Sequence, residues 1–299
     1  MPQEQAVIIA TYSRRMRLRL ASGRDVDARI RGKRLKAVCG DRVQAESIND
    51  ESDWLITEVL PRDNSLTRPN QRGQTEILAA NVDLLIVTAA ASPKPDWYIV
   101  DRYLCAAEAM RIPAAVVFNK TDLEGKNDTI EPALRDYENI GYPVINCSAR
   151  TEQNLQAVAK IIDGKTAIIV GQSGVGKSSI INRLLGGEQQ RTAEISNKTG
   201  EGRHTTVNSM MLSLPGGGQV IDSPGVRDYA PALQSATDVI QGFREIEAAG
   251  HNCRFANCKH LREPGCAVKD AVESEAISPR RYESYRRLLA LTETLEKQL

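Results

Sequence analysis

Apolar and polar residues alternate along the first 65 residues of the chain. A period of two is typical of β-strands that bury one face. Turn-forming pairs with glycine near residues 22–23, 31–32 and 39–41 separate the alternating runs. Several short strands in this length predict a small barrel. The first candidate is an oligonucleotide-binding (OB) barrel, although the pattern alone does not separate it from other five-stranded barrels. The alternating apolar positions are Val7, Ile9, Met16, Leu18, Leu20, Val26, Ala28 and Ile30.

From residue 80 onward, continuous apolar runs alternate with segments of helical periodicity. Uninterrupted Val, Ile and Leu runs are typical of strands buried on both faces. Their alternation with helices predicts a parallel sheet covered by helices. The strand-like runs span 82–90, 114–120, 143–149 and 166–171, and the helical stretches lie near 98–110, 129–140 and 152–162. After about residue 230 the chain is polar and helical.

These patterns predict a multi-domain protein, as the length of 299 residues also does. We place the barrel at residues 1–65 and an α/β domain at 80–230. A polar, turn-rich stretch from Pro61 to Gln74 indicates a linker, which we place at 66–79. A helical domain at 231–299 completes the chain.

Composition excludes wholesale disorder, because 41% of the residues are hydrophobic and 26% are charged. No apolar run approaches the ~20 residues of a membrane span, and the first residues lack a secretory pattern. We therefore expect a cytoplasmic monomer with no membrane partner. The net charge is only +1, but ten Lys or Arg against two acids lie between Arg14 and Lys36. Such a block indicates a surface for a polyanion, with a solvated strand face as the alternative.

Residues 171–178 match the phosphate-binding P-loop pattern G-x-x-x-x-G-K-[ST]. The loop follows an apolar strand and precedes a helical stretch, so backbone N–H groups and a helix N-terminus can hold phosphate oxygens. Lys177 is expected to reach the β- and γ-phosphates and Ser178 to ligate Mg²⁺, with Asp222 as the acid of the metal site. The expected nucleotide-binding residues are Gly171, Gln172, Ser173, Gly174, Val175, Gly176, Lys177, Ser178 and Ser179.

A second motif indicates which base is bound. It resembles the N-K-x-D motif of GTPases and comprises Asn119, Lys120, Thr121 and Asp122. A carboxylate at Asp122 can accept hydrogen bonds from N1–H and the 2-amino group of guanine. Adenine would leave it unpaired, a mismatch that comparable sites reject by about 10⁴-fold. Asn119 is expected to contact N7, and the stem of Lys120 to cover the base. Ser148 and Ala149 resemble the S-A loop that supports the base from its other side.

The order of these motifs is unusual. GTPases usually carry the P-loop before the N-K-x-D and S-A motifs, whereas here both motifs precede it. The order predicts a circularly permuted GTPase domain. An α/β sheet tolerates such a permutation because domain termini often lie close together.

The segment between the P-loop helix and Asp222 has the Gly-, Thr- and Asn-rich composition of a switch loop. Thr205 or Thr206 is expected to complete the Mg²⁺ shell, and we favour Thr206. Val226 stands where many GTPases place a water-orienting glutamine, so intrinsic hydrolysis should be slow. His204 is the candidate catalytic residue that orients water instead, with an exposed loop residue of no catalytic role as the alternative.

Three cysteines and one histidine crowd into a short segment of the C-terminal region. Cys253, Cys258, His260 and Cys266 suit one tetrahedral, structural Zn²⁺. The spacing C-x₄-C-x-H-x₅-C is not a common zinc-finger pattern. His251 is a competing ligand, and free buried cysteines are the alternative.

Together these features resemble the ribosome small-subunit-dependent GTPase A family (the RsgA or YjeQ type). The resemblance covers the whole chain: the basic barrel, the permuted order N-K-T-D, S-A, GQSGVGKSS, GRHTT and DSPG, and the Cys/His knot. It implies a GTP hydrolase, binding Mg²⁺ with GTP or GDP, that acts late in maturation of the small ribosomal subunit and is stimulated by it. It further implies that the OB barrel and the zinc domain contact the rRNA and proteins of the subunit, and that His204 assists hydrolysis.

Two other functions fit the same residues. One is an RNA-binding module whose affinity is gated by nucleotide, and the other is a GTP-dependent metal chaperone with a labile metal. Tyr12 and Trp54 are the only aromatic residues in the barrel segment suited to stacking. We therefore expect the barrel to bind the backbone and shape of folded RNA rather than splayed bases.

Overall fold

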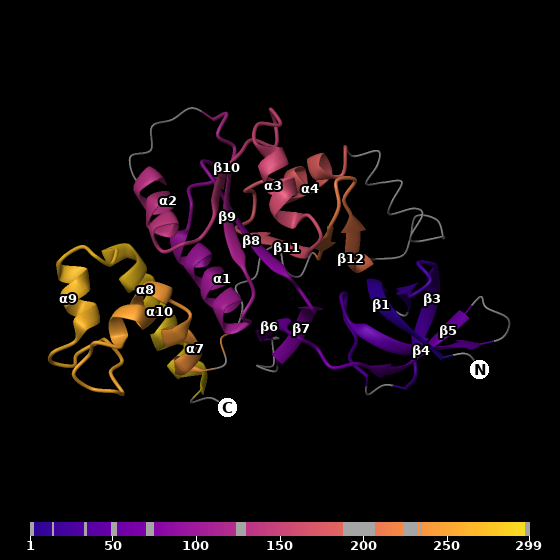
Figure 1. Cartoon of the computed structure of the whole chain (residues 1–299), viewed down its shortest axis with the longest axis horizontal. Helices are drawn as coiled ribbons and strands as arrows, with labels where there is room; N and C mark the ends of the chain where they lie inside the picture. The colour runs from indigo at the N-terminus through magenta and orange to yellow at the C-terminus, as the bar shows by residue number, and fades with distance from the viewer. Residues whose placement is uncertain are drawn as a thin grey trace.

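A computed structural model describes residues 3–13, 15–32, 35–48, 53–69, 75–123, 130–187, 207–223, 233 and 235–296. Three parts follow one another along the longest axis of the molecule: a barrel, an α/β body and a helical lobe, with the body in the middle (Figure 1). Within the described residues, no helix is both long enough and apolar enough to cross a membrane.

The N-terminal part is the predicted five-stranded barrel. β1 pairs with both β2 and β4, and β3 pairs in parallel with β5, so that the strand order closes on itself. The core of the barrel fully buries Ile8, Leu18 and Ile56. In β1 the residues that face this core are Ala6 and Ile8, whereas Val7 and Ile9 of the predicted pattern pack against the core of the body. The strands are β1 (Gln3–Tyr12), β2 (Met16–Leu20), β3 (Asp25–Ile30), β4 (Arg42–Ile48) and β5 (Asp53–Val59).

Part of the basic block is neutralised within the barrel. Arg17 lies 3.0 Å from Asp27 and Arg19 lies 2.8 Å from Asp25, both pairs joining β2 to β3. These arginines sit on the polar face of an alternating strand, which is the solvated-face alternative that the sequence left open.

The body is the predicted parallel sheet covered on both faces. Its parallel strands run in the order β10-β9-β8-β11-β13, with β12 antiparallel beside β13. Successive residues of β8 enter two different cores, one under α1 and α2 and the other under α3 and α4. The strands are β8 (Leu84–Ala90), β9 (Ala114–Asn119), β10 (Val144–Asn146), β11 (Thr166–Gly171), β12 (Val207–Ser213) and β13 (Gln219–Asp222). The helices are α1 (Trp97–Ala109), α2 (Ile130–Asn139), α3 (Leu155–Ile162) and α4 (Lys177–Leu184).

The segment that the sequence indicates as a linker contains a hairpin. β6 (Ser65–Pro69) and β7 (Thr75–Ala80) pair as a two-stranded antiparallel sheet. Leu66, Leu78 and Ala79 from this hairpin are buried in the core under α1 and α2. The chain between barrel and body is therefore packed against the body, and the domain limits drawn from the sequence stay predictions.

The barrel and the body share one sheet. The last residues of β1 leave the barrel and pair with β12, with Ala10 opposite Met210 and Thr11 opposite Ser209. This pairing joins the two parts into a continuous sheet of eleven strands among the described residues. This pairing could not be predicted from the sequence, because a strand pattern does not identify its partner strand.

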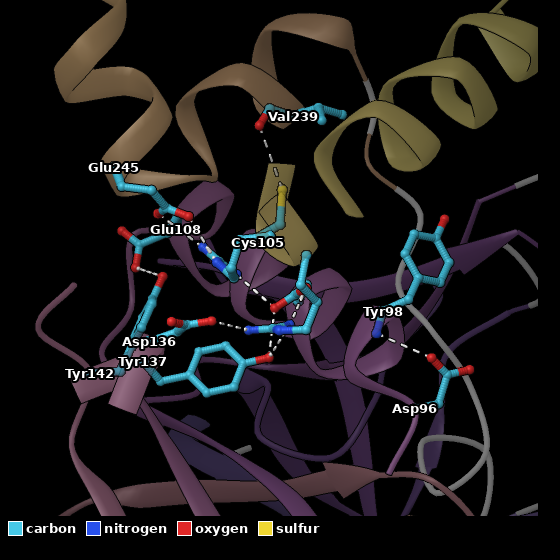
Figure 2. Close-up of polar contacts among 12 residues, drawn as sticks. Asp96, Tyr98, Cys105, Glu108, Asp136, Tyr137, Tyr142, Val239 and Glu245 are labelled. Carbon is cyan, nitrogen blue, oxygen red and sulfur yellow. Dashed lines mark hydrogen bonds and ion pairs between the residues drawn. The ribbon is translucent and has the colours of Figure 1, made fainter. Parts of the chain in front are cut away.

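The helical lobe comprises α7 (Ala236–Gln241), α8 (Arg244–Gly250), α9 (Ala267–Glu273) and α10 (Pro279–Glu296). Figure 2 shows the polar contacts that fasten it to α1 and α2 of the body. The side chain of Asp101 is fully buried and accepts hydrogen bonds from Arg281 (2.8 Å), Arg280 (3.0 Å) and Tyr137 (2.6 Å). Arg281 also donates two bonds to Glu245, at 2.8 and 3.0 Å. This buried network fixes the lobe against the body, and Nε of Arg280 is its one buried side-chain nitrogen without a hydrogen-bond partner among the described residues.

Candidate nucleotide site and metal centre

The permuted motifs meet at one edge of the sheet. Asn119 is the last residue of β9, Gly171 ends β11 and Asp222 ends β13, and Ser148 follows β10. These strands are parallel neighbours or near neighbours, so their carboxyl ends lie at the same edge. Ligands of open α/β sheets bind at this edge, which is where the sequence predicts the nucleotide.

The P-loop runs from Gly171 into the first turn of α4. Gly176 has a φ of 97°, and a Cβ atom there would lie 2.3 Å from Nδ2 of Asn119. Only glycine fits this position, because any side chain would both strain the backbone and displace the asparagine. The Nζ atom of Lys177 donates to the carbonyl oxygens of Gly171 (2.7 Å) and Gln172 (2.8 Å), which keeps the ammonium group at the loop.

Asn119 joins three motifs. Its Nδ2 donates to the carbonyl oxygen of Val175 in the P-loop at 2.9 Å, and its Oδ1 accepts from the backbone N–H of Ala149 at 3.0 Å. The residue is 1% exposed. The sequence predicts that Asn119 contacts guanine N7. In the structure both ends of its amide are engaged by the protein, and they hold the P-loop and the S-A loop together.

Lys120 crosses from the same motif to the P-loop. It has a φ of 63°, and its Nζ donates to the carbonyl oxygens of Ser92 and Gly174, both at 2.7 Å. The neighbouring Thr121 hydroxyl donates to the carbonyl oxygen of Cys147 at 3.1 Å. The stem of Lys120 therefore lies across the site, where it can cover a base.

Asp122 has one carboxylate oxygen engaged by the protein at close range. Its Oδ1 accepts from the hydroxyl of Ser148 at 2.6 Å, and its Oδ2 lies 3.7 Å from the guanidinium of Arg150. Asp122 is 13% exposed whereas Arg150 is 81% exposed. A carboxylate fixed by a buried serine can accept hydrogen bonds from a ligand in a defined direction, as guanine recognition requires.

A cavity of about 670 Å³ connects the base motif to the P-loop. Asp122 and Ala149 line one part of it, and Gly176 and Ser179 line another. The sequence did not single out five further lining residues: Leu123, Arg150, Asn182, Arg183 and Gly187. Arg150 could have been predicted to line the cavity, because it directly follows the S-A pair in the sequence. The others lie on a loop and on a helix face that carry no motif.

The predicted magnesium ligands lie partly inside and partly outside the described residues. Ser178 stands in the first turn of α4 and Asp222 ends β13, which pairs in parallel with β11. Both residues are partly exposed at this edge, and their oxygens suit Mg²⁺. Thr206, together with its alternative Thr205, His204 and Val226 lie outside the described residues.

The Cys/His segment forms a compact cluster in the helical lobe. The ligand atoms of Cys253, Cys258, His260 and Cys266 all lie within 4.8 Å of one another and could hold a metal ion. Sγ of Cys253 is 3.9 Å from Sγ of Cys266 and 3.4 Å from Nδ1 of His260. Tetrahedral Zn²⁺ with Zn–S bonds near 2.3 Å requires sulfur atoms about 3.8 Å apart, so the cluster is compatible with zinc. His251, the competing ligand, is not in the cluster.

Burial acts in opposite ways on the two kinds of ligand in this cluster. It raises the pKa of the Cys258 thiol and lowers the pKa of His260. A neutral imidazole can bind a metal without losing a proton. A buried thiol must lose its proton, and the resulting thiolate is stabilised only by a cation next to it. None of the six cysteines forms a disulfide.

Comparison with known proteins agrees with this geometry. A sequence model of the RsgA GTPase family matches residues 59–231. A relative from Ectopseudomonas mendocina (strain ymp) named "Small ribosomal subunit biogenesis GTPase RsgA" is 42% identical over 255 residues, covering 85% of this chain and 74% of its own. A relative of the same name from Pseudomonas aeruginosa is 38% identical over 291 residues, covering 97% of this chain and 86% of its own.

Two solved structures are similar over nearly the whole chain. YjeQ from Thermotoga maritima superposes with a TM-score of 0.75 at 27% identity, covering 97% of this chain and 99% of its own. YloQ, described as a circularly permuted GTPase, superposes with a TM-score of 0.74 at 26% identity, covering 98% of this chain and 96% of its own. The family match covers more than half of the sequence, and the two folds agree in all three parts. The chain therefore belongs to the RsgA GTPase family.

Proposed function

We propose that this protein is a GTP hydrolase that acts in late maturation of the small ribosomal subunit and that the subunit stimulates its hydrolysis. The observation that carries the proposal is the single cavity lined by both Asp122 and the P-loop glycine Gly176. The names of the relatives, which describe small-subunit biogenesis, supply the biological process.

Guanine selectivity follows from the surroundings of Asp122. The hydroxyl of Ser148 holds the carboxylate, and the base donates N1–H and the 2-amino group to it. The stem of Lys120 covers one face of the ring, and Ala149 supports the other edge. ATP is rejected because adenine has no amino group at C2 and would leave Asp122 unpaired.

Hydrolysis depends on positioning and charge. Lys177 and the N-terminus of α4 stabilise negative charge on the β- and γ-phosphates. Ser178, Asp222 and Thr206 would hold Mg²⁺, which neutralises charge on the same oxygens when bound. Val226 cannot orient water, so we assign this role to His204. The subunit then speeds hydrolysis by ordering the loop that carries His204.

The two outer parts of the molecule contact the subunit in this proposal. The barrel and the helical lobe lie at opposite ends of the long axis (Figure 1) and bind rRNA and neighbouring proteins. One structural Zn²⁺, held by three thiolates and His260, orders the lobe. A monomer in the cytoplasm, without a membrane partner, completes the proposal.

The test is a GTPase assay of the purified protein with no addition, with small subunits and with large subunits. Stimulation by small subunits alone is the expected result, and it should disappear in His204→Ala while GTP binding remains. Equal turnover in all three mixtures would contradict the proposal. In that case a nucleotide-gated RNA-binding module would account better for the same residues.

A further inference from the structure

The loop between α8 and α9, residues 251–266, carries the four clustered metal ligands and lies in the lobe at the opposite end of the molecule from the barrel (Figure 1). Cys253 and Cys258 stand on either side of a four-residue tip, and every residue of the tip is exposed. The proposed function uses the cluster to order the lobe. It assigns no role to the tip.

The tip displays an aromatic ring. Phe255 is 41% exposed and is one of three large apolar side chains exposed among the described residues. The guanidinium of Arg254 lies 5.5 Å from the centre of its ring. The exposed part of the ring is available to a partner.

The tip is also held in place. The backbone N–H of Arg254 donates to the carbonyl oxygen of Gly265 at 3.1 Å, and that of Cys258 donates to the carbonyl oxygen of Phe255 at 3.2 Å. On the other side of the cluster, Tyr285 of α10 donates to the carbonyl oxygen of Lys259 at 2.8 Å. A preformed tip loses little conformational entropy on binding, which favours its use as a contact surface.

The exposed charged side chains of the loop are basic. Arg254, Lys259 and Arg262 are exposed. Lys259 pairs with Glu293 of α10 at 2.7 Å, whereas Arg262 forms no ion pair with any residue that the structure describes. The single acid of the loop, Glu263, is turned inward, because its carboxylate accepts from the backbone N–H groups of Lys259, Leu261 and Arg262 at 2.9–3.0 Å. The outward charge therefore complements a polyanion.

We propose that Phe255 and Arg254 form a stacking surface for one unpaired RNA base, with Arg262 at the adjacent phosphate. The proposal rests on the proposed function, which brings rRNA to the lobe. One exposed ring among basic side chains suits base stacking, whereas an anchor for a protein partner is normally surrounded by other apolar contacts. Stacking on phenylalanine tolerates any base, so this surface recognises an unpaired nucleotide rather than a sequence.

The test uses the full-length, zinc-loaded protein and three variants. Phe255→Ala removes the ring and Phe255→Trp keeps a stacking surface. Leu291→Ala is the matched control, because Leu291 is 36% exposed in the same lobe. Each protein is titrated with a short unstructured RNA, with a blunt RNA duplex and with small ribosomal subunits, and its zinc content is measured.

Phe255→Ala should bind the unstructured RNA about 5- to 100-fold more weakly, the range expected for one lost stack, while Leu291→Ala binds as the parent does. Duplex binding should be unchanged in every variant. Phe255→Trp should bind normally, and the unstructured RNA should quench its additional tryptophan fluorescence. If Phe255→Ala loses zinc, the fluorescence quenching of Phe255→Trp alone decides whether the ring stacks on a base.

Three results would overturn the inference. The first is an unchanged affinity of Phe255→Ala for unstructured RNA, and the second is an equal loss on duplex RNA. The third is weaker binding to subunits by Phe255→Ala without quenching of Phe255→Trp by any RNA, which would assign the tip to a protein partner. Failure of the parent protein to bind small subunits would instead contradict the proposed function, while quenching by unstructured RNA would still support the stacking surface.

Discussion

Asp122 shows how much of the specificity of this site depends on one side chain. Its carboxylate is fixed by the hydroxyl of Ser148 and is only 13% exposed, so it cannot turn away from an unsuitable base. The ligand must therefore match the acceptor pattern of the carboxylate. Changing that pattern should change the base that is bound.

Asp122→Asn should lower the affinity for GTP by about 100-fold or more, because the new amide donates where guanine also donates. The same variant should gain affinity for xanthosine triphosphate, whose C2 carbonyl accepts from the amide. Calorimetry with both nucleotides measures the exchange. Equal weakening for the two nucleotides would indicate a collapsed pocket rather than an altered specificity.

Asn119 supports the site from within the protein. Asn119→Ala leaves the carbonyl oxygen of Val175 and the N–H of Ala149 without their partner, so the two loops should separate. We expect at least about a tenfold loss of affinity for GDP and GTP alike, given the usual cost of buried unpaired groups. Thr121→Val is a milder control, since it removes one hydrogen bond to Cys147. A loss for GTP alone would contradict this account.

The P-loop, the N-K-T-D motif and the S-A pair could be predicted from the sequence, and the structure brings them to one edge of the sheet, whereas Thr206 and His204 lie outside the described residues. Ser92 could not be predicted, since it contributes a backbone carbonyl oxygen to Lys120 and any residue type supplies that group. Arg183 lies on the outer side of α4 and becomes part of the cavity only through the packing of that helix. The two hydrogen bonds of the Asn119 side chain could not be predicted either, because they depend on the distance between the P-loop and the S-A loop.

At the scale of elements, α10 is fastened to α1 by buried charges. Arg281 is 2% exposed and Asp101 is fully buried. Burial alone would lower the pKa of Arg281, but the carboxylates of Asp101 and Glu245 hold it well above its ordinary value. The arginine therefore stays charged and depends on both partners.

Asp101→Ala should destabilise the protein by about 3–5 kcal/mol, because Arg281 loses a partner that it cannot replace with water. The matched control is Arg135→Ala, which removes an exposed pair with Glu131 and should cost at most about 0.5 kcal/mol. Thermal unfolding of the two variants measures the contrast. Similar midpoints for both would show that the buried network contributes little.

Metal removal should affect the lobe and not the body. Cys258→Ser should abolish zinc binding and make residues 251–266 more sensitive to protease, because loss of the metal releases the other three ligands from one another. Cys105→Ala is the matched control, since Cys105 is fully buried on α1 and lies outside the cluster. Zinc analysis and limited proteolysis report the outcome. If the loop of the metal-free variant resisted protease as well as the parent protein does, a structural role for the zinc would be contradicted.

Most elements could be predicted from periodicity, and the exceptions have physical reasons. The hairpin of β6 and β7 was missed because proline and glycine interrupt its alternation, although Leu66 and Leu78 are buried. Buried runs separated by helices predicted the parallel sheet of the body, but the strand order β10-β9-β8-β11-β13 could not be predicted from them. The pairing of β3 with β5 that closes the barrel could not be predicted either, because an alternating pattern does not identify the partner strand.

At the scale of the whole molecule, the pairing of β1 with β12 connects the barrel to the strand that follows the predicted switch segment. Thr11 lies opposite Ser209 in this pairing. Replacing both with cysteine should allow a disulfide, since directly opposed residues fall within bridging distance. Peptide mass spectrometry after mild oxidation detects the bond. The pair Thr11→Cys and Ser213→Cys should remain unlinked, and equal linkage in both would show that the strands slide.

The continuous sheet has a mechanical consequence. A barrel on a loose tether would search its surroundings independently, whereas this one shares backbone hydrogen bonds with the body, and the lobe at the far end is fastened by buried charges. The span between the two ends is thus set by the fold. A molecule built in this way can bind with both ends at once only to a partner whose two binding surfaces are separated by the same distance.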